Sequence, residues 1–547
     1  MSTVQKSMSL TGEPPKSLNA GQRASVFAGM AGLGILVLHL FNQSITNAAL
    51  WLTASLVLMS VGIIGFTIAS YAHKQAGIKN DGVWFKSISS RGVLGWMAGI
   101  ALTGFYIVLY FYAELLGLNP DGANTGVVAL FDPLSRALSG NPASQWFVYG
   151  TLYTVAILAF GVKFIWKYRH NRYEIIRTSS VMFFQTAFAF LIPEFMARLN
   201  GDGFNLPYYD LKNIWPLNYY NFEQYRINDF ISSGAIGMFL LFFGLASIFI
   251  ITPILTYKYG KRWYCSWVCG CGGLAETAGD SFRQLSDKSQ AAWKVERWVV
   301  HSVLVFVVMM TTTVVSVYLG YEGEGYWLSR DTFLFSVAAL LVVLYAAVMI
   351  WKRDTLKKDA IVGATVYLAI SLASVALIYF VDITQIQVNA AYFSFGINEK
   401  IYSLDVAVKS LYGFLIGAIF SGVIGTGFYP IFGNRVWCRF GCPMAAILGL
   451  QQRLFSKFRI TTNGGQCISC GNCSTYCEMG IDVRSYAQKG ENIIRASCVG
   501  CGICSAVCPR GVLKLENGPL EGRINSEAVL LGQDPDLMEL LKSNKSA

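Results

Sequence analysis

The sequence predicts an all-α polytopic membrane bundle of about ten transmembrane helices, followed by a small cysteine-rich domain. The first observation is composition: 54% of the 547 residues are hydrophobic and only 14% are charged, whereas soluble proteins carry about a quarter charged residues. The second is that apolar runs long enough to cross a bilayer, roughly 20 residues, recur as far as residue 432. The third is that all 13 cysteines lie between Cys265 and Cys508.

Ten apolar runs justify the predicted spans. They cover residues 25–42, 49–71, 92–116, 146–166, 178–198, 234–257, 298–319, 332–351, 360–380 and 410–432. If the N-terminus lies inside, every inward loop is basic and the outward loops are poor in Lys and Arg, which is the positive-inside pattern. The sequence therefore predicts a protein of the cytoplasmic (inner) membrane with both termini in the cytoplasm. The inward loops also account for the net charge of +11, so no nucleic-acid partner is expected.

The strongest chemical signal is a doubled cysteine motif after the last span. "CISCGNCSTYC" and "CVGCGICSAVCP" share the spacing C-x2-C-x2-C-x3-C. This spacing binds [4Fe–4S] clusters, and in two-cluster ferredoxins the fourth cysteine of each run ligates the other cluster. Paired zinc sites are the weaker alternative. One cluster is therefore expected on Cys467, Cys470, Cys473 and Cys508, and the other on Cys498, Cys501, Cys504 and Cys477.

Domain boundaries follow from the spans and this motif. The predicted divisions are a cytoplasmic N-terminal segment (1–24), a transmembrane domain (25–432), a cytoplasmic junction (433–462), an α+β two-cluster ferredoxin domain (463–520) and a C-terminal tail (521–547). Because the ferredoxin domain follows an even number of spans, it is expected on the cytoplasmic side, like both termini.

A second cysteine pattern occurs twice, after the sixth and tenth spans. "YGKRWYCSWVCG" and "FGNRVWCRFGCP" both read aromatic-Gly-x-Arg-x-aromatic-Cys-x3-Cys. On a helical turn, residues four apart share a face, so each pair can present two thiols together. The resulting third site, with a cluster or another thiophilic metal, would use Cys265, Cys269, Cys438 and Cys442, with the extra thiol of Cys271 as a possible addition. Redox-active dithiols and buried structural thiols are the alternatives.

The arginines of this repeat are expected to act on the thiols. Arg262 and Arg435 occupy the same position in the two copies. A nearby cation lowers the pKa of a thiol, so we expect both to favour thiolates. The copies differ at one point: Gly270 stands where the second copy has Pro443.

The combination of two C-x3-C elements with a two-cluster motif resembles the NapH/NosR-type membrane polyferredoxin family, over residues 234–515. The resemblance implies a membrane-bound iron–sulfur protein that passes electrons between the quinone pool, or a membrane partner, and a respiratory reductase or related partner. It implies an electron-transfer subunit rather than a stand-alone enzyme. The alternative is an assembly or sensing factor that supplies reducing power or metal to a maturing respiratory enzyme. An ion-coupled pump is a third alternative, and it would need more paired intramembrane carboxylates than the sequence shows.

Three further features carry expectations. The aromatic-rich outward segment 199–233 is expected to form an interfacial belt, with a partner or quinone surface as the alternative. Residues 274–297 mix charges with helix-forming residues, so we expect a solvated connecting helix; the alternative is a cover over the cysteine sites. Glu114 and Glu194, near the outer ends of their spans, are candidate acceptors of a proton from a quinol; the alternative is that they are solvated carboxylates in the membrane interface.

Overall fold

The computed structural model describes residues 18–42, 45–72, 89, 91–120, 122–201, 203–322, 328–389, 401–463 and 466–518. The first 17 residues of the expected N-terminal segment and the whole expected tail lie outside the described residues. Ten described helical stretches are long and apolar enough to cross a membrane. The predicted all-α bundle of ten spans is confirmed, and the chain is a multi-pass membrane protein.

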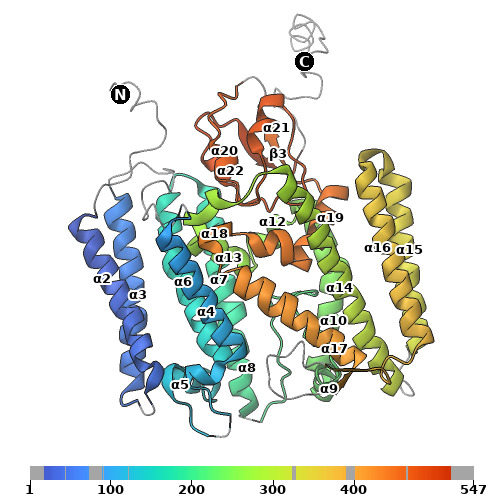
Figure 1. Cartoon of the computed structure of the whole chain (residues 1–547), viewed down its shortest axis with the longest axis horizontal. Helices are drawn as coiled ribbons and strands as arrows, with labels where there is room; N and C mark the ends of the chain where they lie inside the picture. Colours follow the sequence, from blue (N-terminus) through green and yellow to red (C-terminus); the bar gives the residue numbers. More distant parts are fainter. Residues whose placement is uncertain are drawn as a thin grey trace, which may run out of the picture.

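The spans lie side by side, with the C-terminal domain at one end of the bundle (Figure 1). Figure 1 shows α2 and α3 paired on one flank, and α15 and α16 paired on the other. In chain order the spans are α2–η1 (Ala20–Leu38, His39–Phe41), α3 (Ala48–Tyr71), α4 (Val93–Phe111), α6 (Gln145–Lys167), α7–η4–α8 (Arg172–Phe183, Phe184–Leu191, Ile192–Gly201), α10–η6–α11 (Gly234–Ala246, Ser247–Ile251, Thr252–Tyr259), α14 (Gln290–Glu322), α15 (Arg330–Lys352), α16 (Lys358–Phe380) and α17–η11 (Leu404–Tyr412, Gly413–Ile424).

The tenth span ends at Ile424, earlier than the predicted 432. The apolar residues that follow form a separate short helix, α18 (Tyr429–Phe432), in which Tyr429 and Ile431 are buried inside the protein. Their hydrophobicity therefore serves protein packing and not a lipid-facing surface, a distinction that an apolar run alone does not make.

Shorter helices connect the spans or follow the last one. They are η3 (Ala113–Leu116), α5 (Gly126–Ser139), η5 (Tyr219–Phe222), α9 (Gln224–Ser232), α12 (Arg262–Cys265), α13 (Gly270–Thr277), η7 (Ala278–Leu285), η9 (Arg353–Thr355), η12 (Trp437–Gly441) and α19 (Pro443–Phe455). A two-stranded antiparallel sheet, β1 (Gln387–Asn389) with β2 (Ile401–Ser403), precedes α17. The segments η4, η6, η11 and η12 are π-helical. This geometry is rare in proteins, and where it occurs it is often at a functional site.

The aromatic segment 199–233 does not form a simple belt. Its middle part enters the interior, where Trp215 and Tyr219 pack against the core cluster that contains the buried cysteines. The Trp215 indole N–H donates to Thr311 Oγ1 of α14 at 3.0 Å, and the Tyr264 hydroxyl donates to the carbonyl of Lys212 at 3.1 Å. Irregular backbone at this depth is tolerated because protein surrounds it and satisfies its polar groups. The belt expectation is therefore wrong for the middle of the segment.

Residues 274–285 are also not a solvated helix, whereas Lys294, in the part of the segment that belongs to α14, is exposed. Glu276, Asp280 and Arg283 are at most 1% exposed. Their charges are paired with one another and with residues of distant elements. The mixed charges that suggested a solvated surface are instead satisfied internally.

The C-terminal domain (459–516) is built on one antiparallel strand pair. β3 (Arg459–Thr462) pairs with β4 (Leu513–Glu516) in a register that sets Ile460 opposite Leu515. Between the strands lie α20 (Asn472–Thr475), α21 (Val483–Lys489) and α22 (Ile503–Ala506). α20 and α22 follow glycines with positive φ, Gly471 and Gly502, which lets each cysteine run turn sharply. The predicted α+β character of this domain is confirmed.

Candidate iron–sulfur centres

Four cysteines of the C-terminal domain surround one small cavity. Cys467, Cys470, Cys473 and Cys508 line it together. Burial, together with the neighbouring Cys470, Cys508 and Cys467 thiols, raises the pKa of the Cys473 thiol to about 12. Three of these thiols come from the first cysteine run and one from the second. We call these four residues the first ferredoxin site.

The second ferredoxin site consists of Cys498, Cys501, Cys504 and Cys477, which line another small cavity. Burial, together with the neighbouring Cys477 thiol, raises the pKa of the Cys498 thiol to about 11. The negative charge of the Cys473 thiolate, from the first ferredoxin site, also raises the pKa of Cys504. The two ferredoxin sites are therefore neighbours, each with one thiol from the opposite cysteine run.

The two C-x3-C pairs come together in the core. Cys265, Cys269, Cys438 and Cys442 are between 5% and 8% exposed and belong to one apolar cluster. Burial raises the pKa of Cys265 and of Cys442, and thiols of the opposite pair raise both values further. The structure thus joins two segments that are about 170 residues apart in the chain. We call these four residues the paired-motif site.

The shared glycine of the repeat fixes the same backbone turn in both copies. Gly260 has φ 68° and ψ −177°, and Gly433 has φ 95° and ψ 172°. Only glycine adopts this region readily. A side chain at Gly260 would also meet Gln452 Oε1 at 2.6 Å. The repeat is therefore a structural unit, with its glycine at the point where the chain leaves the preceding helix.

The spacing predicted that the two thiols of each pair lie on one helical turn, and the structure shows that they do not. α12 ends at Cys265, and Cys269 is the extended residue that precedes α13. In the second copy Cys438 lies in η12 and Cys442 precedes α19. Cys442 Sγ accepts a hydrogen bond from the Ala445 N–H at 3.4 Å. The later cysteine of each pair therefore sits at a helix N-terminus, where the helix dipole stabilises a thiolate.

The repeat arginines have different roles. Arg435 Nη1 donates to Cys438 Sγ at 3.5 Å. Burial raises the pKa of Cys438 and Arg435 opposes that rise, as predicted. Arg262 instead turns toward the C-terminal domain, where its Nη2 donates to Asn517 Oδ1 at 2.6 Å.

A side-chain amide and a lysine explain why Gly270 replaces the proline of the second copy. A Cβ at Gly270 would lie 2.5 Å from Gln185 Oε1 and 2.9 Å from Lys212 Nζ. Lys212 is buried and donates to Gln185 Oε1 at 3.2 Å. Its positive charge favours the thiolate of Cys269. Sequence reasoning missed Lys212, since only the inward course of segment 199–233 brings it to the site.

Cys271 lies beside the paired-motif site and faces a separate small cavity. Tyr149, Tyr153 and Cys438 line the same cavity. The Cys271 thiol hydrogen-bonds to Cys269 Sγ, and this bond is the largest of several contributions, with backbone N–H bonds and the charge of Lys212, that lower the pKa of Cys269 to about 6. Cys271 thus supports the neighbouring thiolate from outside the set of four.

A buried ion network lies between the paired-motif site and the second ferredoxin site. Its nine members are at most 1% exposed and comprise five basic and four acidic side chains: Lys163, Lys167, Arg177, Arg283, Arg435, Glu174, Glu276, Asp280 and Glu478. Buried charges are costly unless they are paired. Here they are paired across α6, α7, α13, η7 and the C-terminal domain.

Glu478 anchors the C-terminal domain to this buried ion network. It pairs with Arg283 at 2.7 Å and with Arg435 at 3.0 Å, and Asn434 Nδ2 donates to it at 3.1 Å. Burial alone would raise the pKa of Glu478, but the two arginines lower it to about 2. Carboxylate oxygens of Glu478 and Glu276 and the sulfur of Cys501 all lie within 4.8 Å of one another. The sequence showed Glu478 only as a departure from the proline that ends the second run.

The candidate carboxylates Glu114 and Glu194 are not brought to the thiols. Glu194 lies in α8, at the end of the bundle opposite the C-terminal domain (Figure 1). Glu114 lies in η3, which packs against α5 at that same end.

The two ferredoxin sites fit iron–sulfur clusters, because four cysteine sulfurs around one space are the donor set of a [4Fe–4S] cluster and each site lines one cavity with four cysteines. The paired-motif site offers the same number of thiols, from both copies of the repeat, in one apolar core cluster.

Comparison with known proteins finds 4Fe-4S-binding domains over the regions that hold these cysteines. A family model described as a 4Fe-4S dicluster domain matches residues 466–513, which contain all eight cysteines of the two ferredoxin sites. A model described as a 4Fe-4S binding domain matches twice, at 240–289 and 412–461, and each match contains one C-x3-C pair. No solved structure matches this chain.

The chain is also similar to YccM of Escherichia coli (strain K12), which is named as an electron transport protein. The two are 38% identical over 58 residues, which is 11% of this chain and 16% of YccM. The chain thus spans a small part of the length of this curated relative. From the family models and the ten spans, we conclude that the chain is a multi-pass membrane protein with 4Fe-4S-binding domains, and the expected iron–sulfur cofactors are confirmed to that extent.

Proposed function

We propose that this chain is a membrane-bound electron-transfer protein that holds three [4Fe–4S] clusters, at the two ferredoxin sites and at the paired-motif site. The observation that carries the proposal is the order of the three thiol sets. Arg435 contacts Cys438 of the paired-motif site and Glu478, the residue after Cys477 of the second ferredoxin site. Cys504 of that site neighbours Cys473 of the first. The second ferredoxin site therefore adjoins both the paired-motif site and the first ferredoxin site, which supports electron transfer among the three.

A [4Fe–4S] cluster supplies one-electron redox chemistry when bound. The protein's part is to hold the thiols, exclude water and set the local charge. Apolar side chains such as Met444, Val307 and Ile460 bury the thiols in one core cluster. Two arginines of the buried ion network favour neighbouring thiolates: Arg435 acts to lower the pKa of Cys438, and Arg283 acts to lower that of Cys501.

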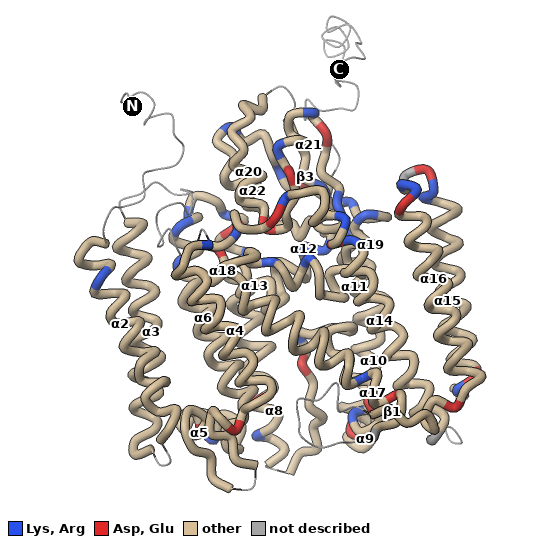
Figure 2. The backbone as a smooth tube through the Cα atoms, in the orientation of Figure 1, with Lys and Arg blue, Asp and Glu red and all other residues tan. Residues whose placement is uncertain are grey.

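The orientation and partners belong to the same proposal. Lys and Arg gather at the end of the bundle that carries the C-terminal domain (Figure 2), which supports a cytoplasmic location for that domain in the inner membrane. The NapH/NosR-type resemblance implies electron exchange with the quinone pool on one side and a respiratory reductase or related partner on the other. The name of the relative YccM supports an electron-transport role.

Iron and sulfide analysis with EPR of the purified full-length protein tests the proposal. Three clusters require about twelve irons and twelve sulfides per chain. About eight irons would show that the paired-motif site holds no cluster, and zinc in place of iron would overturn the electron-transfer role. Binding of copper or iron at the paired motifs, without quinol-dependent reduction of the clusters in membranes, would favour the assembly or sensing factor instead.

A further inference from the structure

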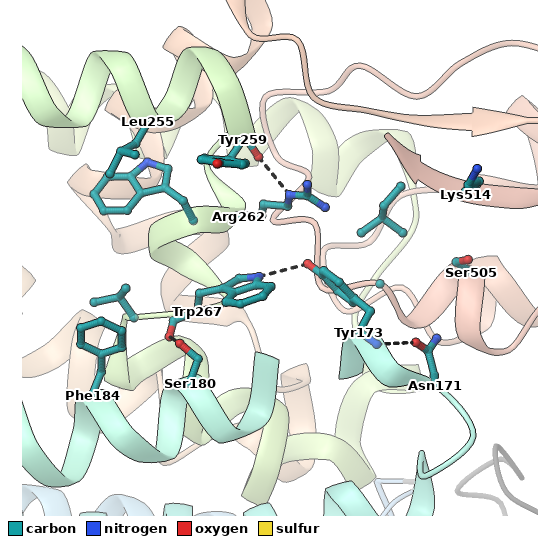
Figure 3. A pocket seen from close by; sticks show the side chains of 14 residues that line it. Asn171, Tyr173, Ser180, Phe184, Leu255, Tyr259, Arg262, Trp267, Ser505 and Lys514 are labelled. Atoms are coloured by element: carbon teal, nitrogen blue, oxygen red, sulfur yellow. Dashed lines mark hydrogen bonds between the residues drawn. The ribbon is translucent and has the colours of Figure 1, made fainter. Parts of the chain in front are cut away.

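A cavity of about 730 Å³ lies where α7, α11 and α12 meet the C-terminal domain. Figure 3 shows its lining: Phe184 and Leu255 at one end, Asn171, Ser505 and Lys514 at the other, and aromatic side chains with Arg262 between them. We call it the interface cavity. Its size is typical of pockets for small organic ligands.

The interface cavity adjoins the chain turns that carry cysteines of the paired-motif site and of the second ferredoxin site. Trp267 and Val268, which line it, lie between Cys265 and Cys269 in the chain, and the lining residue Gly502 follows Cys501. Two hydrogen bonds join these walls across Tyr173. The Trp267 indole N–H donates to the Tyr173 hydroxyl at 3.2 Å (Figure 3), and that hydroxyl donates to the Gly500 carbonyl at 2.8 Å. A molecule in the cavity would therefore lie against the backbone of two cysteine turns.

One end of the interface cavity belongs to the membrane. Phe184 and Leu255 are parts of membrane-spanning stretches. The adjoining residues Phe183 and Ile254 are 58% and 60% exposed on the outer surface of those helices, which is the surface that faces lipid in a bundle of this kind. The opposite end carries N–H and O–H donors beside the C-terminal domain. A ligand that fits has an apolar tail, a planar ring and polar oxygens.

We propose that the interface cavity binds the head group of a lipid-soluble quinone or quinol. The aromatic side chains of Tyr173, Trp263 and Trp267 offer faces and edges for a planar ring, and Arg262, which lies among them, offers N–H donors for ring oxygens. Because the apolar end adjoins the spans, the isoprenoid tail can extend into the bilayer. This assignment rests on the proposed electron-transfer function and gives it an entry point from the membrane.

The test uses the full-length protein in quinone-free nanodiscs. An azido-quinone is photolysed, the labelled peptides are mapped by mass spectrometry, and unlabelled quinone is added as competitor. The expected label lies in peptides that contain Tyr173–Phe184 or Leu255–Val268. Leu255→Trp, which fills the apolar end, should reduce labelling by at least about tenfold, equal to about 1.4 kcal/mol of binding free energy. The matched control is Ile254→Trp on the lipid-facing surface, which should label as the unmodified protein does.

Iron content and dithionite-reduced EPR spectra are recorded for every variant, so that the two proposals can fail separately. Absent iron–sulfur signals would overturn the proposed function. With intact signals, any of three results would overturn the quinone assignment alone. The label could lie in other peptides, the two variants could label equally, or phospholipid could displace the label where quinone does not.

Discussion

Replacing Glu478 with glutamine should loosen the attachment of the C-terminal domain to the membrane bundle. The Glu478 carboxylate lies 2.7 Å from Arg283 and 3.0 Å from Arg435, and all three side chains are buried. Removing one partner of a buried ion pair costs about 3–5 kcal/mol. Arg283 keeps Asp280 and Arg435 keeps Glu276 as partners, so we expect the lower end, about 3 kcal/mol.

Hydrogen exchange measures this loss directly. If the domain opens locally, a loss of about 3 kcal/mol makes the amides of α20, α21 and α22 exchange about a hundredfold faster. Glu491→Gln is the matched control, because Glu491 is an exposed carboxylate of the same domain. Iron analysis of both variants separates loosening from cluster loss, since Glu478 follows Cys477 in the chain. Equal exchange in the two variants would refute the anchoring role of the buried ion network.

Three further predictions concern the paired-motif site. The double substitution of Cys265 and Cys438 by serine should lower iron from about twelve to about eight per chain and leave the ferredoxin EPR signals in place; unchanged iron would contradict the third cluster. Cys271→Ser should keep about twelve irons, because Cys271 lies outside the set of four, and a loss of four would make it a ligand. Gly270→Ala should cost about 1–3 kcal/mol, because its Cβ would lie within 2.9 Å of two polar side chains, whereas Gly104→Ala, with open space around it, should leave the melting temperature unlowered.

The spans were predictable because lipid demands a simple pattern. A transmembrane helix needs about 20 apolar residues whatever its partners are, so each apolar run indicates its own span. The error at the tenth span has the same origin: Tyr429 and Ile431 add to the apolar run, yet protein covers them. Hydrophobicity does not distinguish lipid from protein as the apolar environment.

The iron–sulfur motifs were recognisable in the sequence because the spacing of their cysteines is local. The C-x2-C-x2-C-x3-C spacing indicates a [4Fe–4S] site by itself. By contrast, the charges of residues 274–285 look solvated in sequence, because their partners Glu478 and Arg435 lie more than 150 residues away. Lys212 was missed for the same reason: its role depends on a loop that turns back into the protein. Long-range pairing of buried charges leaves no local signal.

The two copies of the C-x3-C motif show how one repeated turn supports two different tasks. Their glycines adopt the same rare conformation, so the cysteines are presented alike. Their arginines differ: Arg262 lines the interface cavity, while Arg435 joins the buried ion network beside the second ferredoxin site. The first copy thus faces the proposed quinone position, and the second faces the proposed exit toward the C-terminal domain. A repeated motif is expected to depart from its pattern at positions that function requires. Gly270 is such a position, because a proline there would displace Lys212 from the site.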